Sequence, residues 1–267
     1  MPNIIPCFRA VLAIAALMVS ANSLAAVCEA TSGDTTVALL ELYTSEGCSS
    51  CPPAERWLNE LARGGLVPQR LVPLALHVDY WNYLGWSDRF SQAAFSQRQR
   101  DLARRTNARS VYTPGVVLSG HEYRGWSRRD FGADIERVNR VPARANLALR
   151  LERAGETLRL DVKAALKGKP ADVGLYVALY ESNLRTEVRA GENRGRTLEH
   201  SFVVRRLLGP LPFDASGKAR MSAPVSIDKG WKAADLGVAA FVQETDSTEV
   251  LQALALPLCR QTAPHRQ

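Results

Sequence analysis

The spacing of apolar and polar residues changes along the chain. Residues 37–43 (VALLELY) and 71–78 (LVPLALHV) are apolar on both faces, a pattern typical of buried strands in a parallel sheet. Between them, residues 52–63 begin with two prolines and carry apolar side chains at helical spacing. This part of the chain therefore predicts a strand, a helix and a second strand.

Further elements follow in the same region. Residues 87–109 predict a polar helix with a solvated, arginine-rich face. Residues 115–118 predict a short strand, which turns tightly into a hairpin partner over 121–124. A last helix is expected over 126–141, capped by Ser127. The predicted order of elements is β-α-β-α-β-β-α.

After Pro142 the chain consists of short alternating or apolar runs separated by turn residues, at the spacing of a β-sandwich. Such runs occupy residues 147–151, 158–165, 174–181, 200–207, 221–227 and 236–244. The sequence thus predicts an α/β domain over 28–142 and an all-β, sandwich-like domain over 143–260. We expect residues 261–267 to form a flexible tail.

The N-terminus has the features of a secretory signal peptide over residues 1–25. Arg9 supplies a positive charge, residues 10–21 are apolar, and Ser23 and Ala25 are the small residues of a cleavage site. The apolar run is short for a membrane span, which takes about 20 residues; a retained signal anchor is the alternative. We expect an exported protein, periplasmic or secreted, with no stable membrane insertion after cleavage.

The net charge of +7 bears on the choice of partners. In a cytosolic protein such a charge would permit nucleic-acid binding, but outside the cytoplasm it means at most attraction to acidic surfaces or anionic headgroups. We therefore expect no nucleic-acid partner. The sequence carries no indication of the oligomeric state.

Four cysteines remain once the predicted signal peptide is removed. Cys48 and Cys51 are close together, whereas Cys28 and Cys259 lie near the two ends of the mature chain. An exported protein would normally pair two leftover cysteines, so we expect a structural disulfide between Cys28 and Cys259. Two free thiols, or an intermolecular bridge through Cys28, are the rival interpretation.

The Cys48–Cys51 pair stands at the predicted start of a helix. Unpaired N–H groups and the helix dipole stabilise a thiolate there, which favours redox chemistry with Cys48 attacking and Cys51 resolving. Haem attachment would need a histidine where Pro52 stands, and zinc would need further ligands at a matching spacing. Cu(I) bound by the two thiolates and an inert staple remain as alternatives. We expect no cofactor and no metal.

The strand order and the dithiol together resemble thioredoxin. The resemblance implies that Thr113-Pro114 contains a cis-proline, which faces the dithiol and orients the backbone of a bound partner. It also implies a buried acid beneath the resolving cysteine. Glu41 is the candidate, although thioredoxins place this acid about one residue nearer to the dithiol.

A narrower resemblance covers most of the mature chain. Residues 41–55 (ELYTSEGCSSCPPAE), 74–91, 109–120 and 181–205 are similar to segments of domain-of-unknown-function family 1223. This resemblance implies an exported, thioredoxin-like protein with a second, C-terminal part. It brings no established substrate.

The remaining features are secondary to the dithiol. The aromatic loop over 79–86 supplies Tyr80, Trp81 and Trp86, which we interpret with Thr113 as substrate-binding residues; a buried satellite cluster is the alternative. We interpret His77 as a core residue and assign no chemistry to 193–200. The expected function is thiol–disulfide exchange with protein or small-molecule thiols and disulfides. The alternative is a non-catalytic module that senses redox state or binds a soft metal.

Overall fold

The computed structural model describes residues 26–128, 130–168 and 172–259. The predicted signal peptide (1–25) and the predicted flexible tail (261–267) lie outside these residues. Within them, three α-helices accompany fourteen strands. The helices are α1 (Pro52–Arg63), α2 (Ala93–Arg105) and α3 (Phe131–Asn139), and short 3₁₀ turns occupy Asn82–Leu84 and Ala233–Asp235.

An eight-stranded mixed sheet forms the centre of the molecule. In spatial order its strands are β14 (Val250–Pro257), β13 (Leu236–Glu244), β8 (Val173–Glu181), β11 (Val203–Pro212), β3 (Leu71–His77), β2 (Ala38–Thr44), β4 (Gly115–Leu118) and β5 (His121–Glu122). β2 and β3 are parallel and fully buried along their length, as their apolar sequences predict.

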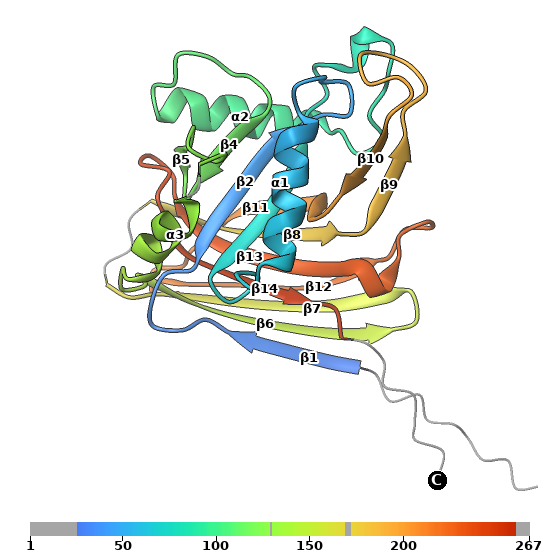
Figure 1. Cartoon of the computed structure of the whole chain (residues 1–267). Coiled ribbons are helices and arrows are strands. Elements are labelled where there is room, and N and C mark those ends of the chain that lie inside the picture. Colours follow the sequence, from blue (N-terminus) through green and yellow to red (C-terminus); the bar gives the residue numbers. More distant parts are fainter. Residues whose placement is uncertain (1–25, 129, 169–171, 260–267) are drawn as a thin grey trace, which may run out of the picture.

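Two smaller sheets complete the fold. One has the strand order β1 (Ala26–Thr31), β6 (Ala145–Ala154), β7 (Thr157–Leu166) and β12 (Lys218–Ser226), and the other is the hairpin of β9 (Leu184–Glu187) and β10 (Thr197–His200). Figure 1 shows the helices gathered around β2, β3 and β4, and the four-stranded sheet on the opposite side of the molecule. One apolar core lies among the helices and the central strands, and a second lies between the two larger sheets.

The predicted fold class is wrong. The order β-α-β-α-β-β-α does occur, as β2-α1-β3-α2-β4-β5-α3. These strands, however, do not form the sheet of an α/β thioredoxin-like domain followed by a separate sandwich. β3 pairs with β11 from the C-terminal half, through Ala75 and Val203, and β11 continues into β8, β13 and β14. The chain is therefore a mostly β protein with one large sheet built from both halves.

The physical reason is that an apolar strand sequence reports burial and not the identity of the neighbouring strand. β3 is covered on both faces whichever strand lies at its side. β11 pairs with the edge of β3 that β2 leaves open, and the N–H of Ala75 donates to the carbonyl of Phe202 at 2.8 Å.

Two helix boundaries also differ from the prediction. α2 begins at Ala93 and not at residue 87, because the Asp88 carboxylate accepts the N–H groups of Glu46 and Phe90 and holds that segment as a loop. α3 begins at Phe131 and follows Asp130, so Ser127 does not cap it. In the described part of the chain, no helix is both long and apolar enough to cross a bilayer.

Candidate functional site

The dithiol lies between the C-terminal end of β2 and the start of α1. Cys48 and Cys51 form a disulfide with their Cα atoms 5.5 Å apart. The carbonyl of Cys51 accepts the N–H groups of Ala54 and Glu55, so this cysteine directly precedes the helix, as predicted. Cys48 is 2% exposed and Cys51 is fully buried. Both cysteines are therefore buried in this oxidised form.

Thr113 and Pro114 lie next to the dithiol loop. The Thr113–Pro114 peptide bond is cis, and the Ser50 hydroxyl donates to the Thr113 carbonyl at 3.4 Å. The indole N–H of Trp81 donates to the Thr113 hydroxyl at 2.7 Å, which joins the aromatic loop to the same place. The structure thus brings the predicted proline segment and the dithiol together.

The aromatic loop is more firmly tied than a free binding platform. Besides the Trp81 bond, the Tyr80 hydroxyl donates to Gln99 at 3.0 Å and the Trp86 indole donates to Glu46 at 2.8 Å. Tyr80, Trp81 and Trp86 are all half-buried. These side chains pack the loop against the dithiol segment and α2.

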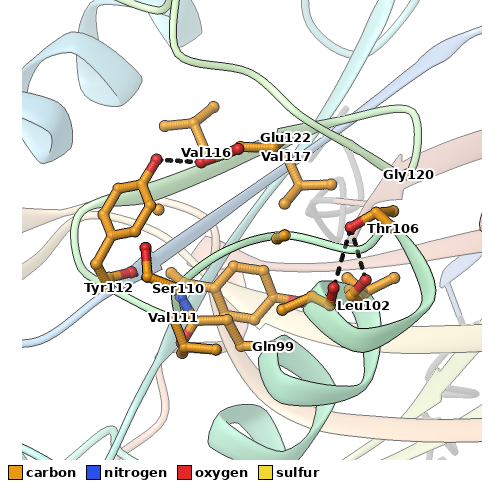
Figure 2. A pocket seen from close by; sticks show the side chains of 14 residues that line it. Gln99, Leu102, Thr106, Ser110, Val111, Tyr112, Val116, Val117, Gly120 and Glu122 are labelled. Atoms are coloured by element: carbon orange, nitrogen blue, oxygen red, sulfur yellow. Dashed lines mark hydrogen bonds between the residues drawn. The ribbon is translucent and has the colours of Figure 1, made fainter.

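A pocket opens beside Thr113, between α2, residues 108–112 and the β4–β5 hairpin. Figure 2 shows Tyr112 with its hydroxyl bonded to Glu122, and Gln99 reaching in from α2. The Gln99 side-chain amide donates to the Tyr112 carbonyl at 2.7 Å. Val111 and Tyr112 are exposed apolar residues at this rim. The pocket therefore adds an apolar surface directly before the cis-proline.

Glu41 does not lie on the dithiol side of the sheet. Its carboxylate accepts from Arg98 on α2 through Nε at 2.6 Å and Nη2 at 3.1 Å. Thr44, three positions along β2, instead donates to Glu55 on α1 at 2.6 Å. Alternate strand positions face opposite sides, so Glu41 faces α2 and Thr44 faces α1. Arg98, predicted to be solvated, is buried in this ion pair.

Five titratable side chains gather in a buried cluster close to the dithiol, here called the His–carboxylate cluster. Its members come from the dithiol loop, α1, the end of β3, the segment before α2 and the end of β10: Glu46, Glu55, His77, Asp88 and His200, all buried. The parallel pairing of β2 with β3, and of β3 with the start of β11, brings these residues together at one end of the strands.

Both histidines of the cluster are held by carboxylates. His77 Nδ1 lies 2.6 Å from Asp88 Oδ2, and His200 Nε2 lies 3.1 Å from Glu46 Oε1. Since an ionised carboxylate can only accept, both of these ring nitrogens carry a proton. Burial alone would lower the pKa of His200, but the carboxylates of Glu55 and Glu46 outweigh it and raise that pKa to about 10.

The loop between β9 and β10 covers the dithiol segment. The Asn193 side-chain amide donates to the carbonyls of Glu46 at 2.8 Å and Cys48 at 2.9 Å. Glu192 accepts the N–H of Ser49 at 3.0 Å. Sequence reasoning assigned no chemistry to 193–200 and missed Asn193, His200 and the cluster. The one available signal was that the family resemblance includes this stretch.

The second cysteine pair is also present. Cys28 on β1 is joined to Cys259, just after β14, with 5.9 Å between their Cα atoms. This is the pairing expected from the cysteine count. It lies on the side of the four-stranded sheet, and Cys28 is part of the core between the two larger sheets.

Comparison with known proteins concerns the family and the fold. Residues 39–243 match the family described as "Protein of unknown function (DUF1223)". The structure is similar to that of an Agrobacterium tumefaciens protein, with 23% identity and a TM-score of 0.61 over 88% of this chain and 100% of that one. It is also similar to HBP35 of Porphyromonas gingivalis, with 18% identity and a TM-score of 0.63 over 88% and 79% of the two chains. No curated protein shows significant sequence similarity.

Proposed function

Because the chain belongs to the DUF1223 family, whose function is unknown, we propose a function from its own site: thiol–disulfide exchange at Cys48 and Cys51. The observation that carries this proposal is a closed disulfide immediately before α1, beside the Thr113–Pro114 segment. A sulfur at a helix N-terminus leaves readily as a thiolate, because unpaired backbone N–H groups and the helix dipole stabilise the negative charge.

The exchange proceeds in two balanced steps. The thiolate of a partner attacks Cys48 Sγ, the Cys48–Cys51 bond breaks, and Cys51 leaves as a thiolate that takes up a proton from solvent. The partner's second thiolate then attacks the partner sulfur that is bonded to Cys48. This step forms the partner's disulfide and releases Cys48 as a thiolate. In the reverse direction Cys48 attacks a partner disulfide and Cys51 resolves it. Either direction moves two electrons without a cofactor.

Partners are protein or small-molecule thiols and disulfides. An extended protein segment can lie along Thr113–Pro114, and the exposed side chains of Val111 and Tyr112 offer it an apolar contact. Two disulfides in one chain favour an oxidising compartment, so we place the protein outside the cytoplasm. Thiol–disulfide exchange outside the cytoplasm requires no nucleic-acid partner, whatever the net charge of +7.

A second candidate function is redox sensing without turnover. The observation in its favour is the burial of both sulfurs beneath the β9–β10 loop and the aromatic loop. In that role opening of the pair would alter the loops that cover it, and exchange would be slow.

The test is reduction of insulin, or exchange with glutathione, by wild type and by the Cys48→Ala variant. Activity falls to the uncatalysed background in Cys48→Ala and stays in the Cys28→Ser/Cys259→Ser double variant. Equal activity in wild type and Cys48→Ala would refute exchange. Slow exchange by the wild-type protein, together with a spectrum that changes when the Cys48–Cys51 bond is reduced, would favour redox sensing. A reduction potential of the Cys48–Cys51 pair of about −120 mV would indicate an oxidase, and one of about −270 mV a reductase.

A further inference from the structure

Three buried polar atoms converge in the His–carboxylate cluster: His77 Nε2 has no hydrogen-bond partner, and Glu55 Oε2 and His200 Nδ1 face each other. All three lie within 4.8 Å of one another. Buried side-chain polar atoms are satisfied in the large majority of cases, so the unpartnered His77 Nε2 beside the Glu55–His200 contact needs an explanation. None of the three atoms is required for the exchange chemistry proposed above.

The remaining atoms of the same three side chains are each fixed by a neighbour. Asp88 holds His77 Nδ1, Glu46 holds His200 Nε2, and the Thr44 hydroxyl donates to Glu55 Oε1 at 2.6 Å. Metal-bound histidines almost always donate their other ring N–H to a carboxylate, a backbone carbonyl or water, which orients the ligating nitrogen. Both histidines here have such a partner.

The closest contact among these three atoms is between His200 and Glu55. His200 Nδ1 lies 2.6 Å from Glu55 Oε2, but the two groups are not aligned as a hydrogen bond. Tetrahedral Zn²⁺, with bonds near 2.0 Å, separates neighbouring ligand atoms by about 3.3 Å. That value lies between the closest contact and the 4.8 Å limit of the group. Small side-chain movements therefore suffice to place an ion between the three atoms.

Charge provides an independent reason for a cation. Glu46, Glu55 and Asp88 bring three carboxylates into a buried volume, and such charges are costly unless they are paired. In the described part of the chain, their ionic partners are the two histidines and no lysine or arginine. A divalent ion supplies the missing positive charge without a long side chain.

We propose that Glu55, His77 and His200 bind Zn²⁺ through Oε2, Nε2 and Nδ1. Two imidazoles and one carboxylate form a ligand set that zinc accepts, with the fourth position left for water. Binding releases to solvent the Nδ1 proton that His200 otherwise directs at Glu55. Asp88, Glu46 and Thr44 orient these ligands. The proposal is independent of thiol–disulfide exchange, and it assigns no ligand role to either cysteine.

The test uses the full chain with both disulfides closed, so that no thiolate is available to a metal. Protein is stripped of metal with a chelator under denaturing, non-reducing conditions and refolded with Zn²⁺ or Co²⁺. One ion per chain is expected by elemental analysis. Co²⁺ should give the visible bands of a four-coordinate site, and the zinc absorption-edge spectrum should show imidazole and oxygen ligands without sulfur.

Matched variants locate the ion. Glu55→Gln, His77→Gln and His200→Gln should each weaken binding at least about a hundredfold, and Asp88→Asn about 10- to 100-fold, as for loss of an orienting partner. Glu60→Gln on the exposed face of α1 and His121→Gln in the β4–β5 hairpin should bind as wild type does. Where a variant fails to fold, the ligand count from the wild-type spectrum decides.

Three outcomes would overturn the proposal. The first is a folded, oxidised wild type that retains less than stoichiometric Zn²⁺ and Co²⁺. The second is unchanged affinity in all three ligand variants. The third is binding that appears only after reduction and is lost in Cys48→Ala/Cys51→Ala, which would place the metal on the thiolates. None of these results would bear on the insulin assay, so the two proposals fail separately.

Discussion

At the scale of single residues, the position of an acid along β2 decides what it can do. Glu41 and Thr44 are three residues apart, so their side chains lie on opposite faces of the sheet. Glu41 is paired with Arg98, whereas Thr44 contacts Glu55 on the dithiol side. The offset of one residue from the thioredoxin pattern is therefore a change of face and not a small displacement.

Glu41→Gln should lower stability and leave the dithiol unaffected. Removing one partner of a buried ion pair strands Arg98, which costs about 3 kcal/mol of the free energy of unfolding. Urea unfolding measures the loss, with the exposed Glu60→Gln as control. The rate of thiol–disulfide exchange should stay within about twofold of wild type, because Glu41 faces α2. A large fall in that rate at unchanged stability would restore Glu41 as a catalytic residue.

Asn193→Ala should open the dithiol segment locally. The carbonyls of Glu46 and Cys48 both lose their donor, at about 1 kcal/mol for each bond. We expect faster amide hydrogen exchange over residues 46–51 and faster reduction of the Cys48–Cys51 bond by dithiothreitol.

Asn139→Ala is the matched control for this variant. Asn139 also donates to two backbone carbonyls, those of Thr36 and Arg70, on α3 and away from the dithiol. It should destabilise the protein by a similar amount without changing the reduction rate. Equal acceleration in both variants would mean that global stability, and not the β9–β10 loop, protects the pair.

The residues of the candidate site differ in how far the sequence alone reveals them. The dithiol, its place before a helix and Thr113-Pro114 are local patterns and are predictable. His200 and Asn193 stand 154 and 145 positions from the residues they contact, Glu46 and Cys48. Nothing in their own neighbourhood distinguishes them from surface polar residues. The pairing of β3 with β11 and the packing of β10 on α1 bring them to the dithiol.

At the scale of elements, strongly apolar or alternating segments are predicted correctly and their partners are not. β2, β3, β4 and α1 occur close to their expected positions. The short, polar strands β9 and β10 are not among the predicted strands, because Leu184–Glu187 and Thr197–His200 carry few apolar residues. Their hairpin is stabilised by packing on α1, where Asn59 donates to the Glu199 carbonyl at 2.9 Å.

The Cys28–Cys259 disulfide fastens the first described strand to the end of the last one. Cys28→Ser/Cys259→Ser removes a crosslink that spans 231 positions. The chain-entropy description assigns such a loop about 5 kcal/mol, so the melting temperature should fall by roughly 10–20 °C. Calorimetry measures the shift. Thiol–disulfide exchange at Cys48 should persist in this variant. If exchange were lost along with stability, the two disulfides would not be independent.

At the scale of the whole molecule, one sheet joins residues that the sequence places in two domains. The core around β2 and β3 includes Phe202, Val204 and Phe241 from beyond residue 143. β3 has its outer edge on β11. Without the C-terminal strands, the fully buried strand β3 would therefore become a solvent-exposed edge.

A fragment of residues 26–142 should fail to fold cooperatively. Near-ultraviolet circular dichroism should show no fixed aromatic environment, and urea should produce no sigmoidal transition, in contrast to residues 26–259 as control. The fragment loses the β11 edge and the aromatic side chains that complete the core. A cooperative transition in the fragment would support the predicted division at residue 143.

The late position of the loop that covers the dithiol has a consequence for the order of events during synthesis. At roughly 5–20 residues per second, the 145 positions between Cys48 and Asn193 take roughly 7–30 seconds to produce. During that interval the pair has no cover, and Cys28 waits longer still for Cys259. Native connectivity then depends on Cys48 and Cys51 closing with each other before Cys28 reaches them. In chains stalled ahead of residue 193 and placed under oxidising conditions, alkylation should show the 48–51 bond already formed; a bond from Cys28 to either cysteine would reveal a later reshuffling step.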